Sequence, residues 1–456
     1  MHYDLAVIGG GPGGYGAALY ADRHGMSVAV IERDRLGGTC LHRGCVPARA
    51  YLHITEAAAA ARSFTQNAMV PFDRRAMLAQ KNEIVARLAQ GLQDRIEGTS
   101  VKLLKGTGTL LTNTGPFQVR VAKDGESQRL TADRVILATG GKPSRLPLPG
   151  CNDPDAWTSD HLLGEAGAQP FQSLLIVGGG VIGVEMSCVY TRLGVEVTLL
   201  EAEKNCLPKL DRELGRGVEL LLKDMGVRLI TDAQLQRIVR DLQGFFVASV
   251  EKGGLQRVSA ERVLLATGRR PATMGSYVED MAPAMEHGHW TVDEHYQTTL
   301  PGVYAIGDVN GLSNLAHAAH AQGLAAVSHI LGREEPIFSR LVPSCVYTTP
   351  EVASVGLTQE EAKTQGREVA VGKALTAYNA RSLIEGQDQG FIKLVVDQKT
   401  KQLLGAQIFC GRAADLLGEL TLAITQGLSA TELLRPMRAH PTFYEAVTDA
   451  VEAALK

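Results

Sequence analysis

Two cysteines near the N-terminus have the residue type and spacing best suited to chemistry in this sequence. Cys40 and Cys45 lie in the segment Gly-Gly-Thr-Cys-Leu-His-Arg-Gly-Cys-Val-Pro, which begins at Gly37, five residues after Glu32. Glu32 stands where a dinucleotide-binding unit would place an acid against a ribose. A thiol pair so close to a predicted nucleotide site suggests that electrons pass between a disulfide and a bound cofactor.

The spacing of the two cysteines predicts an irregular backbone. In a regular helix five residues rise about 7.5 Å and turn about 500°, so the two side chains would not face each other. A disulfide needs Cα atoms roughly 4.4 to 6.8 Å apart. We therefore expect a distorted turn, which Gly44 and Pro47 favour. A position in the first turn of a helix would also lower the pKa of a thiol.

Two other interpretations of the pair remain open at this point. The cysteines could serve only in packing, or they could form a metal site together with His42. No fourth ligand is evident nearby in the sequence, so we predict no metal.

Composition and charge narrow the class of protein. The 456 residues suggest roughly three domains of about 150 residues each. A net charge of -3 gives no electrostatic reason to expect nucleic acid or an anionic membrane as a partner. No apolar run approaches the ~18 residues of a membrane-spanning helix. The chain enters a predicted strand at Tyr3, and its seven cysteines are an odd number. We therefore expect no leader peptide and a cytoplasmic location, where a disulfide is usually catalytic.

The chain contains an internal repeat of strand, glycine-rich turn, helix and strand. In each copy an acid follows the first glycine by 23 positions, Glu32 after Gly9 and Glu201 after Gly178. The first glycine makes a tight turn, the second lets the backbone approach a pyrophosphate, and the third lets the helix pack on the strand. The two copies predict two nucleotides, or one nucleotide and one relic. The glycines concerned are Gly9, Gly11 and Gly14 in the first copy, and Gly178, Gly180 and Gly183 in the second.

A second pair of similar segments supports the duplication. Ala138-Thr139-Gly140 returns as Ala266-Thr267-Gly268, and each copy follows an apolar strand. The first copy is longer and holds the cysteine pair and a helical stretch over 74–98. The apolar side chains on one face of that stretch are interpreted as core packing: Met77, Ile84, Leu88, Leu92 and Ile96. From about residue 341 strands alternate with helices and no nucleotide motif occurs, which indicates a separate α+β domain.

Together these segments resemble the flavin-dependent pyridine nucleotide-disulfide oxidoreductases, and the resemblance covers nearly the whole chain. It implies an α/β fold with two Rossmann-like dinucleotide-binding domains and a C-terminal α+β dimerisation domain. Residues 1–147 would be the first part of the FAD-binding domain with the redox disulfide, and residues 272–340 its return segment. Residues 148–271 would bind NAD, and residues 341–456 would form the dimer. The matching segments also include 303–308, 347–351 and 440–442 with Glu445.

The resemblance also implies which residues contact the cofactors. FAD would bind the first unit and a nicotinamide nucleotide the second. Glu201 and Glu203 disfavour a 2′-phosphate, so NAD is expected rather than NADP. His317 and His320 are spaced for a metal, but a helix N-terminus near the flavin is the preferred interpretation. The further cofactor contacts expected are Gly108 at the adenine end, Thr139, Gly140 and Gly268, Asp308 at the ribityl chain, and Leu315, Ala316 and His317 near the flavin ring.

The same resemblance assigns roles in catalysis. Cys40 would exchange with the substrate and Cys45 would be the thiolate against the flavin. His440 would be the general base that accepts a proton from the substrate dithiol, and Glu445 would orient it. On spacing alone, Thr442 to Glu445 could equally be a capping box for the last helix.

The sequence departs from the family pattern within the cysteine segment. His42-Arg43 replaces the usual Asn-Val, and Ala48-Arg49 replaces Ser-Lys. The family lysine lies near the flavin N5 atom and pairs with the glutamate that is Glu185 here. Arg49 keeps the charge, but its planar guanidinium is not equivalent to an ammonium. We therefore expect the tuning of the flavin to differ.

The activity implied is oxidation of a protein-bound dihydrolipoyl dithiol with reduction of NAD. In this family the histidine reaches the cysteine pair of the other subunit, so an obligate homodimer is expected. The partner would be a lipoyl-bearing protein of a 2-oxoacid dehydrogenase or glycine cleavage complex. The alternatives are an NAD(P)H-dependent reductase of a low-molecular-weight disulfide and an inactive scaffold subunit of a complex.

Overall fold

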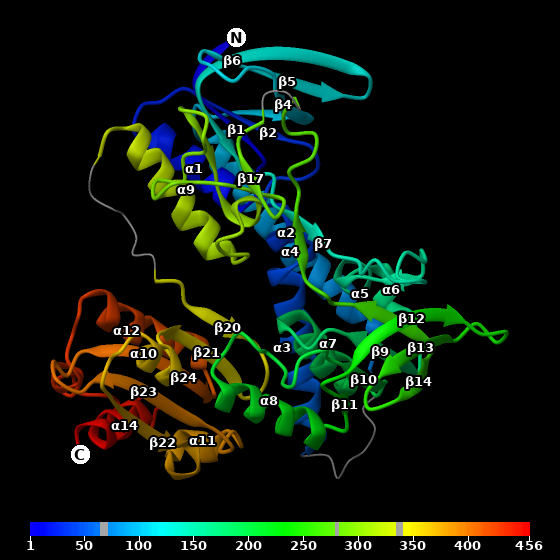
Figure 1. Cartoon of the computed structure of the whole chain (residues 1–456), viewed down its shortest axis with the longest axis vertical. Coiled ribbons are helices and arrows are strands. Elements are labelled where there is room, and N and C mark those ends of the chain that lie inside the picture. The colour runs from blue at the N-terminus through cyan, green and yellow to red at the C-terminus, as the bar shows by residue number, and fades with distance from the viewer. Residues whose placement is uncertain (64–71, 279–281, 334–340) are drawn as a thin grey trace.

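The computed structural model describes residues 1–63, 72–278, 282–333 and 341–456. Three sheets with their helices form three lobes, and long helices connect the upper and lower parts of the molecule (Figure 1). The fold is mixed α/β, as predicted. Within the described ranges, no helix combines the length and the apolarity that crossing a bilayer would require.

The first sheet is built on the first glycine-rich unit. Its parallel strands lie in the order β3-β2-β1-β6-β19, and β4 and β5 extend β6 as an antiparallel meander. The strand β19 comes from a segment far along the chain, so the sheet is completed only after the second unit. Helices α1 and α9 pack against each other beside this sheet (Figure 1). The bounds are β1 His2–Ile8, α1 Pro12–Arg23, β2 Val28–Glu32, β3 Lys102–Lys105, β4 Thr107–Leu110, β5 Phe117–Lys123, β6 Glu126–Leu137, β19 Val303–Ala305 and α9 Ala316–Ile330.

The second sheet has five parallel strands like those of the first. Their order is β11-β10-β9-β15-β8, and the antiparallel meander β12-β13-β14 forms a separate sheet. The two similar segments that follow the central strands pair with each other as β7 and β16. The bounds are β7 Gly141–Pro143, β8 Ala156–Trp157, α5 Ser159–Leu162, α6 Glu165–Ala168, β9 Ser173–Val177, α7 Val181–Arg192, β10 Glu196–Leu200, α8 Arg212–Asp224, β11 Arg228–Ile230, β12 Gln234–Arg240, β13 Phe246–Glu251, β14 Leu255–Ala260, β15 Arg262–Leu265, β16 Arg269–Pro271, β17 Met285–Glu286 and β18 His289–Trp290.

The third sheet is antiparallel, with the order β20-β21-β24-β23-β22. Helices α12 and α14 cover it and enclose a separate apolar core. This is the α+β arrangement predicted for the C-terminal part. The bounds are β20 Ser344–Val346, β21 Glu351–Gly356, α10 Gln359–Thr364, β22 Val369–Leu375, α11 Ala380–Ile384, β23 Phe391–Asp397, β24 Leu403–Cys410, α12 Ala413–Thr425, α13 Ala430–Leu433 and α14 Glu445–Leu455.

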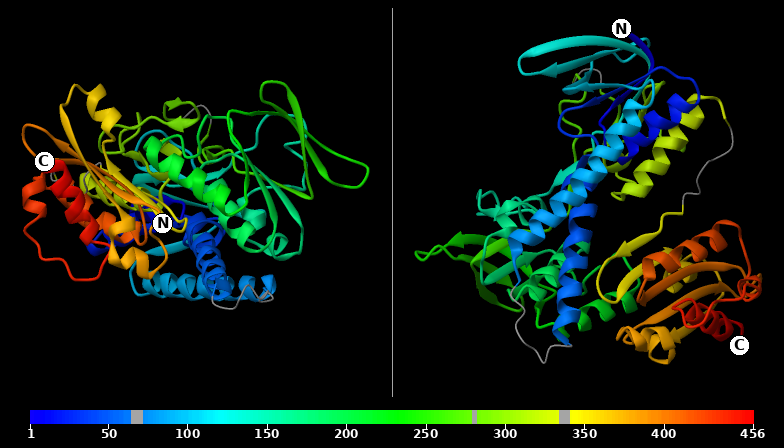
Figure 2. Two further views of the ribbon diagram at one scale, coloured as in Figure 1. Left: turned by 90° about the horizontal axis from the view of Figure 1, so that it is seen from below. Right: turned by 180° about the vertical axis from the view of Figure 1, so that it is seen from behind.

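Three helices occupy the extra length of the first unit. The short helix α2 (Gly38–Arg43) is followed by α3 (Cys45–Ser63) and α4 (Arg74–Glu97). Helices α3 and α4 lie side by side and run from the first unit down to the second, where α3 packs on α7 (Figure 2). Met77 and Ile96 on α4 are buried, whereas Leu88 on the predicted apolar face is 49% exposed. The predicted core role therefore holds at both ends of this helix but not at Leu88.

The helices of the two glycine-rich units begin within the glycine motifs. Helix α1 begins at Pro12 and α7 at Val181. The second glycine of each motif is the N-cap, so the last residues of the motif already belong to the first helical turn. Consequently the N–H groups of that turn, which have no partner within the helix, point at whatever binds beside the glycines.

A buried ion pair joins the C-terminal lobe to α8. The ammonium of Lys393 on β23 lies 2.9 Å from Asp211 and 2.8 Å from Glu213, and the Lys393 and Asp211 side chains are only 5% and 7% exposed. Removing one member of a buried pair leaves the other charge uncompensated. We therefore expect Lys393→Met to lower the free energy of unfolding by about 3–5 kcal/mol, measured by denaturant titration. The matched control is Lys363→Met, since Lys363 pairs with Glu360 on an exposed surface and should change stability by less than about 0.5 kcal/mol.

Candidate active site

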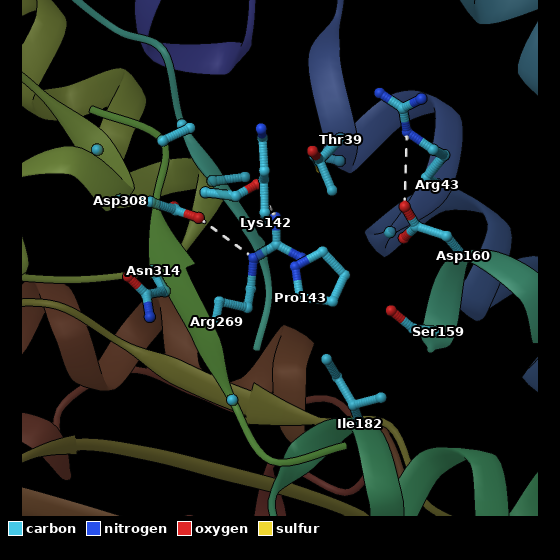
Figure 3. Close-up of a pocket in the computed structure, with 18 of the residues that line it drawn as sticks. Thr39, Arg43, Lys142, Pro143, Ser159, Asp160, Ile182, Arg269, Asp308 and Asn314 are labelled. Carbon is cyan, nitrogen blue, oxygen red and sulfur yellow. Dashed lines mark hydrogen bonds and ion pairs between the residues drawn. The ribbon is translucent and has the colours of Figure 1, made fainter. Parts of the chain in front are cut away.

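A cavity of about 1260 Å³ brings most of the predicted site residues together. Both glycine-rich turns, the cysteine segment and the N-terminus of α9 line it, so it spans the first and second units. Figure 3 shows that Arg43 and Asp160 face one another across part of it, and that Arg269 reaches Asp308. Of the predicted residues, those that line it are Gly9, Gly11, Glu32, Cys40, Cys45, Arg49, Gly108, Thr139, Gly140, Gly178, Gly180, Glu185, Glu201, Gly268, Asp308, Leu315 and Ala316.

The glycines of the two motifs have different surroundings. Gly9 and Gly178 have φ of 114° and 110°, values that L side chains rarely adopt. A Cβ atom on Gly11 or Gly180 would meet no atom within 4 Å, because these glycines face the open cavity. By contrast, the third glycine of each motif packs against the preceding strand. A Cβ on Gly14 would lie 1.9 Å from the Gly9 carbonyl oxygen, and one on Gly183 would lie 1.8 Å from that of Gly178.

The crowding at Gly14 predicts a large effect of a small substitution. We expect Gly14→Ala to force α1 away from β1, to lower the flavin content of the purified protein, and to destabilise it by about 1–3 kcal/mol. Flavin absorbance per chain and denaturant titration measure the two effects. Gly91→Ala is the matched control, since Gly91 is exposed within α4 and a Cβ there meets no atom within 4 Å. It should stabilise by about 0.5–1 kcal/mol, and an equal result for both variants would contradict the crowding argument.

The two acids occupy equivalent places beside the glycine turns. Glu32 accepts hydrogen bonds from the Gly10 and Asp34 backbone N–H groups, both at 2.7 Å. Glu201 accepts from Gly179 at 2.5 Å and from Glu203 at 2.8 Å. Each carboxylate is thus fixed at the edge of the cavity, with lone pairs left for a hydroxyl group of a ligand.

The cysteine segment has the distorted backbone that the spacing predicts. Helix α2 ends at Arg43 and α3 begins at Cys45, so Gly44 breaks the helix between the two cysteines. A Cβ atom on Gly44 would lie 3.1 Å from the Thr39 carbonyl oxygen and 3.4 Å from the Cys40 Cα atom. This close approach returns the chain toward Cys40. Both cysteines are free thiols in the structure, and Cys45 is the more exposed of the two.

The thiols of the pair differ in acidity. The hydrogen bond between them lowers the pKa of Cys45 below its usual value and raises that of Cys40. We expected the helix N-terminus to lower the thiol pKa, but the main cause at Cys45 is the neighbouring thiol. Both cysteines line the cavity, and the pair favours a thiolate at Cys45 with Cys40 as its hydrogen-bond donor. Among the described residues, no group of three or more His, Cys, Asp or Glu side chains could hold a metal ion.

His440 and Glu445 lie outside this cavity, in the C-terminal lobe. The His440 Nδ1 atom is 2.8 Å from Glu445 Oε1, and the imidazole is 73% exposed. Hydrogen bonds from the Thr442 N–H group and from His440 lower the pKa of Glu445. Only half of the predicted capping box forms: Glu445 accepts from the Thr442 N–H group, but the Thr442 hydroxyl donates to Ala439 and α14 begins at Glu445. Within one chain the site therefore lacks the expected base.

Arg49 does not form the pair that the family pattern suggests. Its Nη2 atom lies 2.6 Å from Glu351 on β21, and its guanidinium lies 4.3 Å from the ring centre of Tyr347. Glu185 instead accepts a hydrogen bond from the Tyr347 backbone N–H group at 3.0 Å. The planar guanidinium of Arg49 thus pairs with a carboxylate of the C-terminal lobe. His317 also differs from expectation, since its Nε2 atom lies 2.8 Å from the Pro343 carbonyl oxygen rather than in the cavity.

Sequence reasoning missed several polar residues of the cavity. Arg269 bonds both Asp308, at 3.2 Å, and the Gly141 carbonyl oxygen, at 2.6 Å. Its position directly after Gly268 in the repeated segment was the available signal. Arg43 pairs with Asp34 at 2.8 Å and lies 4.0 Å from Asp160. No sequence signal marked Asp160, because only the fold brings α5 to the cysteine segment.

Comparison with known proteins defines the class. Residues 3–323 match the family described as pyridine nucleotide-disulphide oxidoreductase, and residues 342–451 match its dimerisation domain. The chain therefore belongs to this family of flavin- and pyridine nucleotide-dependent oxidoreductases, and it carries the domain through which the family forms homodimers.

Individual relatives are similar over their full length. The chain is 35% identical to a dihydrolipoyl dehydrogenase of Bacillus subtilis, with 99% of this chain and 98% of the relative covered. It is 36% identical to that of Thermus scotoductus, with 100% and 98% covered. Among solved structures, LpdA of Mycobacterium tuberculosis has a TM-score of 0.90 at 27% identity, covering 98% of each chain. The flavoprotein disulfide reductase RclA of Escherichia coli has a TM-score of 0.87 at 26% identity, covering 99% of each.

Proposed function

We propose that this chain is a dihydrolipoyl dehydrogenase, which oxidises a protein-bound dihydrolipoyl dithiol and reduces NAD. The observation that carries the proposal is the single cavity in which two dinucleotide motifs and a thiol pair meet. Relatives at about 35% identity over the whole length bear this name. The expected partner is a lipoyl-bearing protein of a 2-oxoacid dehydrogenase or glycine cleavage complex.

The residues of the first unit fit FAD. Gly11 faces open space where a pyrophosphate would approach, and the buried Thr139 Oγ1 atom has no hydrogen-bond partner although Thr139 lines the cavity. Asp308, Leu315 and Ala316 would contact the flavin half, and Gly108 the adenine end. When bound, FAD supplies the two-electron acceptor between the dithiol and NAD.

Cys40, Cys45 and His440 would carry out the thiol chemistry. In the oxidised enzyme, a substrate thiol gives its proton to the partner subunit's His440 and attacks the Cys40 sulfur of the Cys40–Cys45 disulfide. Cys45 leaves as a thiolate, and the second substrate thiol then attacks the mixed disulfide. This releases oxidised substrate and leaves two electrons on the cysteine pair, with a proton on His440 and one on Cys40. The hydrogen bond from Cys40 stabilises the Cys45 thiolate at the cavity.

The second unit is assigned to NAD. Gly180 faces the cavity as Gly11 does, and Glu201 would accept hydrogen bonds from ribose hydroxyls. Glu201 and Glu203 together would repel a 2′-phosphate. We expect dihydrolipoamide to be oxidised much faster with NAD than with NADP in a steady-state assay.

We also propose the division of the chain given by the sequence. The break at 147/148 separates the first sheet from the second, and that at 271/272 follows β16, after which β19 returns to the first sheet. The last boundary, at 340/341, adjoins residues outside the described ranges. Residues 341–456 would then form the dimerisation domain.

A direct assay separates this function from its alternatives. Purified protein is tested with dihydrolipoamide and NAD, and with NADH or NADPH and glutathione disulfide. We expect turnover mainly with the first pair. Turnover confined to the second would support the disulfide-reductase alternative, the activity named for RclA. Protein without flavin and without turnover would indicate a scaffold subunit.

A further inference from the structure

Arg49, the cationic residue that follows the redox cysteines, forms an ion pair with the C-terminal lobe. Arg49 lies one helical turn after Cys45 on α3, and its Nη2 atom is 2.6 Å from Glu351 Oε1. The other oxygen of Glu351 accepts a hydrogen bond from the Ala414 N–H group at 3.1 Å. Glu351 is therefore held from two sides, and Tyr347 supports the guanidinium with its ring face. These contacts hold the Arg49 guanidinium at Glu351, and it forms no ion pair with a second carboxylate, Glu185.

That second carboxylate, Glu185, is buried and has no ion-pair partner among the described residues. It is 7% exposed and accepts one hydrogen bond, from the Tyr347 N–H group. Burial raises the pKa of Glu185 to about 7, and the hydrogen bond from Tyr347 and the more distant charge of Arg49 offset only part of this effect. The charge of Arg49 on α3 lowers the pKa of Glu185. In turn, the charge of Glu185 raises the pKa of four groups around it: Cys45 on α3, Cys188 on α7, Cys345 on β20 and Tyr347 directly after β20.

Glu185 and Cys45 both line the cavity, and the charge of Glu185 acts on the Cys45 thiol. A negative charge on Glu185 raises the pKa of Cys45, because like charges repel and the carboxylate of Glu185 is buried. A proton on Glu185 removes that repulsion. We propose that Glu185, left without an ion-pair partner by the contact between Arg49 and Glu351, is a proton-carrying positioning residue that controls how readily Cys45 ionises.

This inference deepens the proposed function and rests on it only for the use of the Cys45 thiolate. When Cys45 becomes a thiolate, an ionised Glu185 takes up a proton from solvent. The Cys45 thiolate and the Glu185 carboxyl group together then carry a charge of about one negative unit instead of two. No redox step is added, because only a proton moves. The test is therefore made on the thiol and not on turnover, so a failure of dihydrolipoamide oxidation would leave it intact.

The experiment follows alkylation of Cys45 by iodoacetamide in the reduced protein from pH 5 to 10, quantified by mass spectrometry of the peptide. In the wild type, we expect a broad profile, since two interacting groups titrate together. In Glu185→Gln the repulsion is gone, so the profile should become that of a single group and move to lower pH by at least about half a unit. An unchanged profile would overturn the proposal.

A second variant keeps the test decisive if Glu185→Gln does not fold. Glu351→Gln removes the partner of Arg49 but leaves an amide oxygen for the Ala414 N–H group. The freed guanidinium can turn to Glu185 and hold it ionised, so the inflection near neutral pH should move to lower pH. A profile that stays in place in this variant would also contradict the proposal. Glu360→Gln, an exposed carboxylate on α10, is the matched control and should leave the profile unchanged.

Discussion

Replacing Cys45 by serine should abolish oxidation of dihydrolipoamide while the protein keeps its flavin. A serine cannot form the disulfide that accepts electrons from the substrate. We therefore expect kcat to fall by on the order of 10⁴-fold or more, as when a covalent catalyst is removed. Cys45 faces the cavity and is not buried in the core, so a hydroxyl group there is not left without water. Steady-state assay, flavin absorbance per chain and thermal unfolding measure the three properties.

Cys40→Ser is the comparison variant for Cys45→Ser. Cys40→Ser removes the sulfur that meets the substrate but leaves the Cys45 sulfur at the cavity. Both variants should lose turnover with dihydrolipoamide. However, iodoacetamide should still alkylate Cys45 in Cys40→Ser, whereas Cys45→Ser has no thiol at position 45 to alkylate. Turnover near the wild-type rate in Cys45→Ser would refute the disulfide relay.

Replacing His440 by glutamine should lower kcat by about 10²- to 10⁴-fold, the usual contribution of a general base. Glutamine keeps a polar side chain of similar size but cannot accept and return a proton. His440 is 73% exposed, so the loss should come without a loss of stability. A variant with normal kcat would show that another group accepts the substrate proton.

A hybrid dimer tests whether the site is shared between subunits. His440 lies outside the cavity of its own chain, in the lobe that matches the dimerisation domain. Chains carrying Cys45→Ser and chains carrying His440→Gln are given different tags, coexpressed and purified through both tags. If His440 serves the partner's cysteine pair, the hybrid has one intact site and regains activity. If each chain uses its own His440, the hybrid stays as inactive as both parents.

The local sequence was sufficient to predict the parts of the site that depend on neighbouring residues. A glycine at position 14 or 183 is required because a Cβ atom there would collide with a carbonyl oxygen five residues earlier. The break at Gly44 follows from the spacing of Cys40 and Cys45 alone, since a regular helix would point the two sulfurs apart. Such steric requirements act over a few residues, so they can be recognised in the order of the residues.

Tertiary structure decided the partners of the charged and polar side chains. Arg49 is 302 residues from Glu351 in the sequence, and a guanidinium can pair with any carboxylate that the fold brings within reach. The family pattern suggested Glu185, but the fold brings Glu351, the first residue of β21, within reach of Arg49. Leu88 belongs to a correct helical stripe but is exposed, because the described part of the chain leaves that side of α4 uncovered.

The residue order thus determined two dinucleotide units, a redox-suitable thiol pair and a separate C-terminal domain. The fold alone decided that Glu185 has no ion-pair partner among the described residues and that His440 lies apart from the cysteines of its own chain. The physical reason is that the two kinds of interaction act over different distances along the chain. Backbone sterics act between near neighbours, whereas the charge environment of a buried side chain is set by every element packed around it.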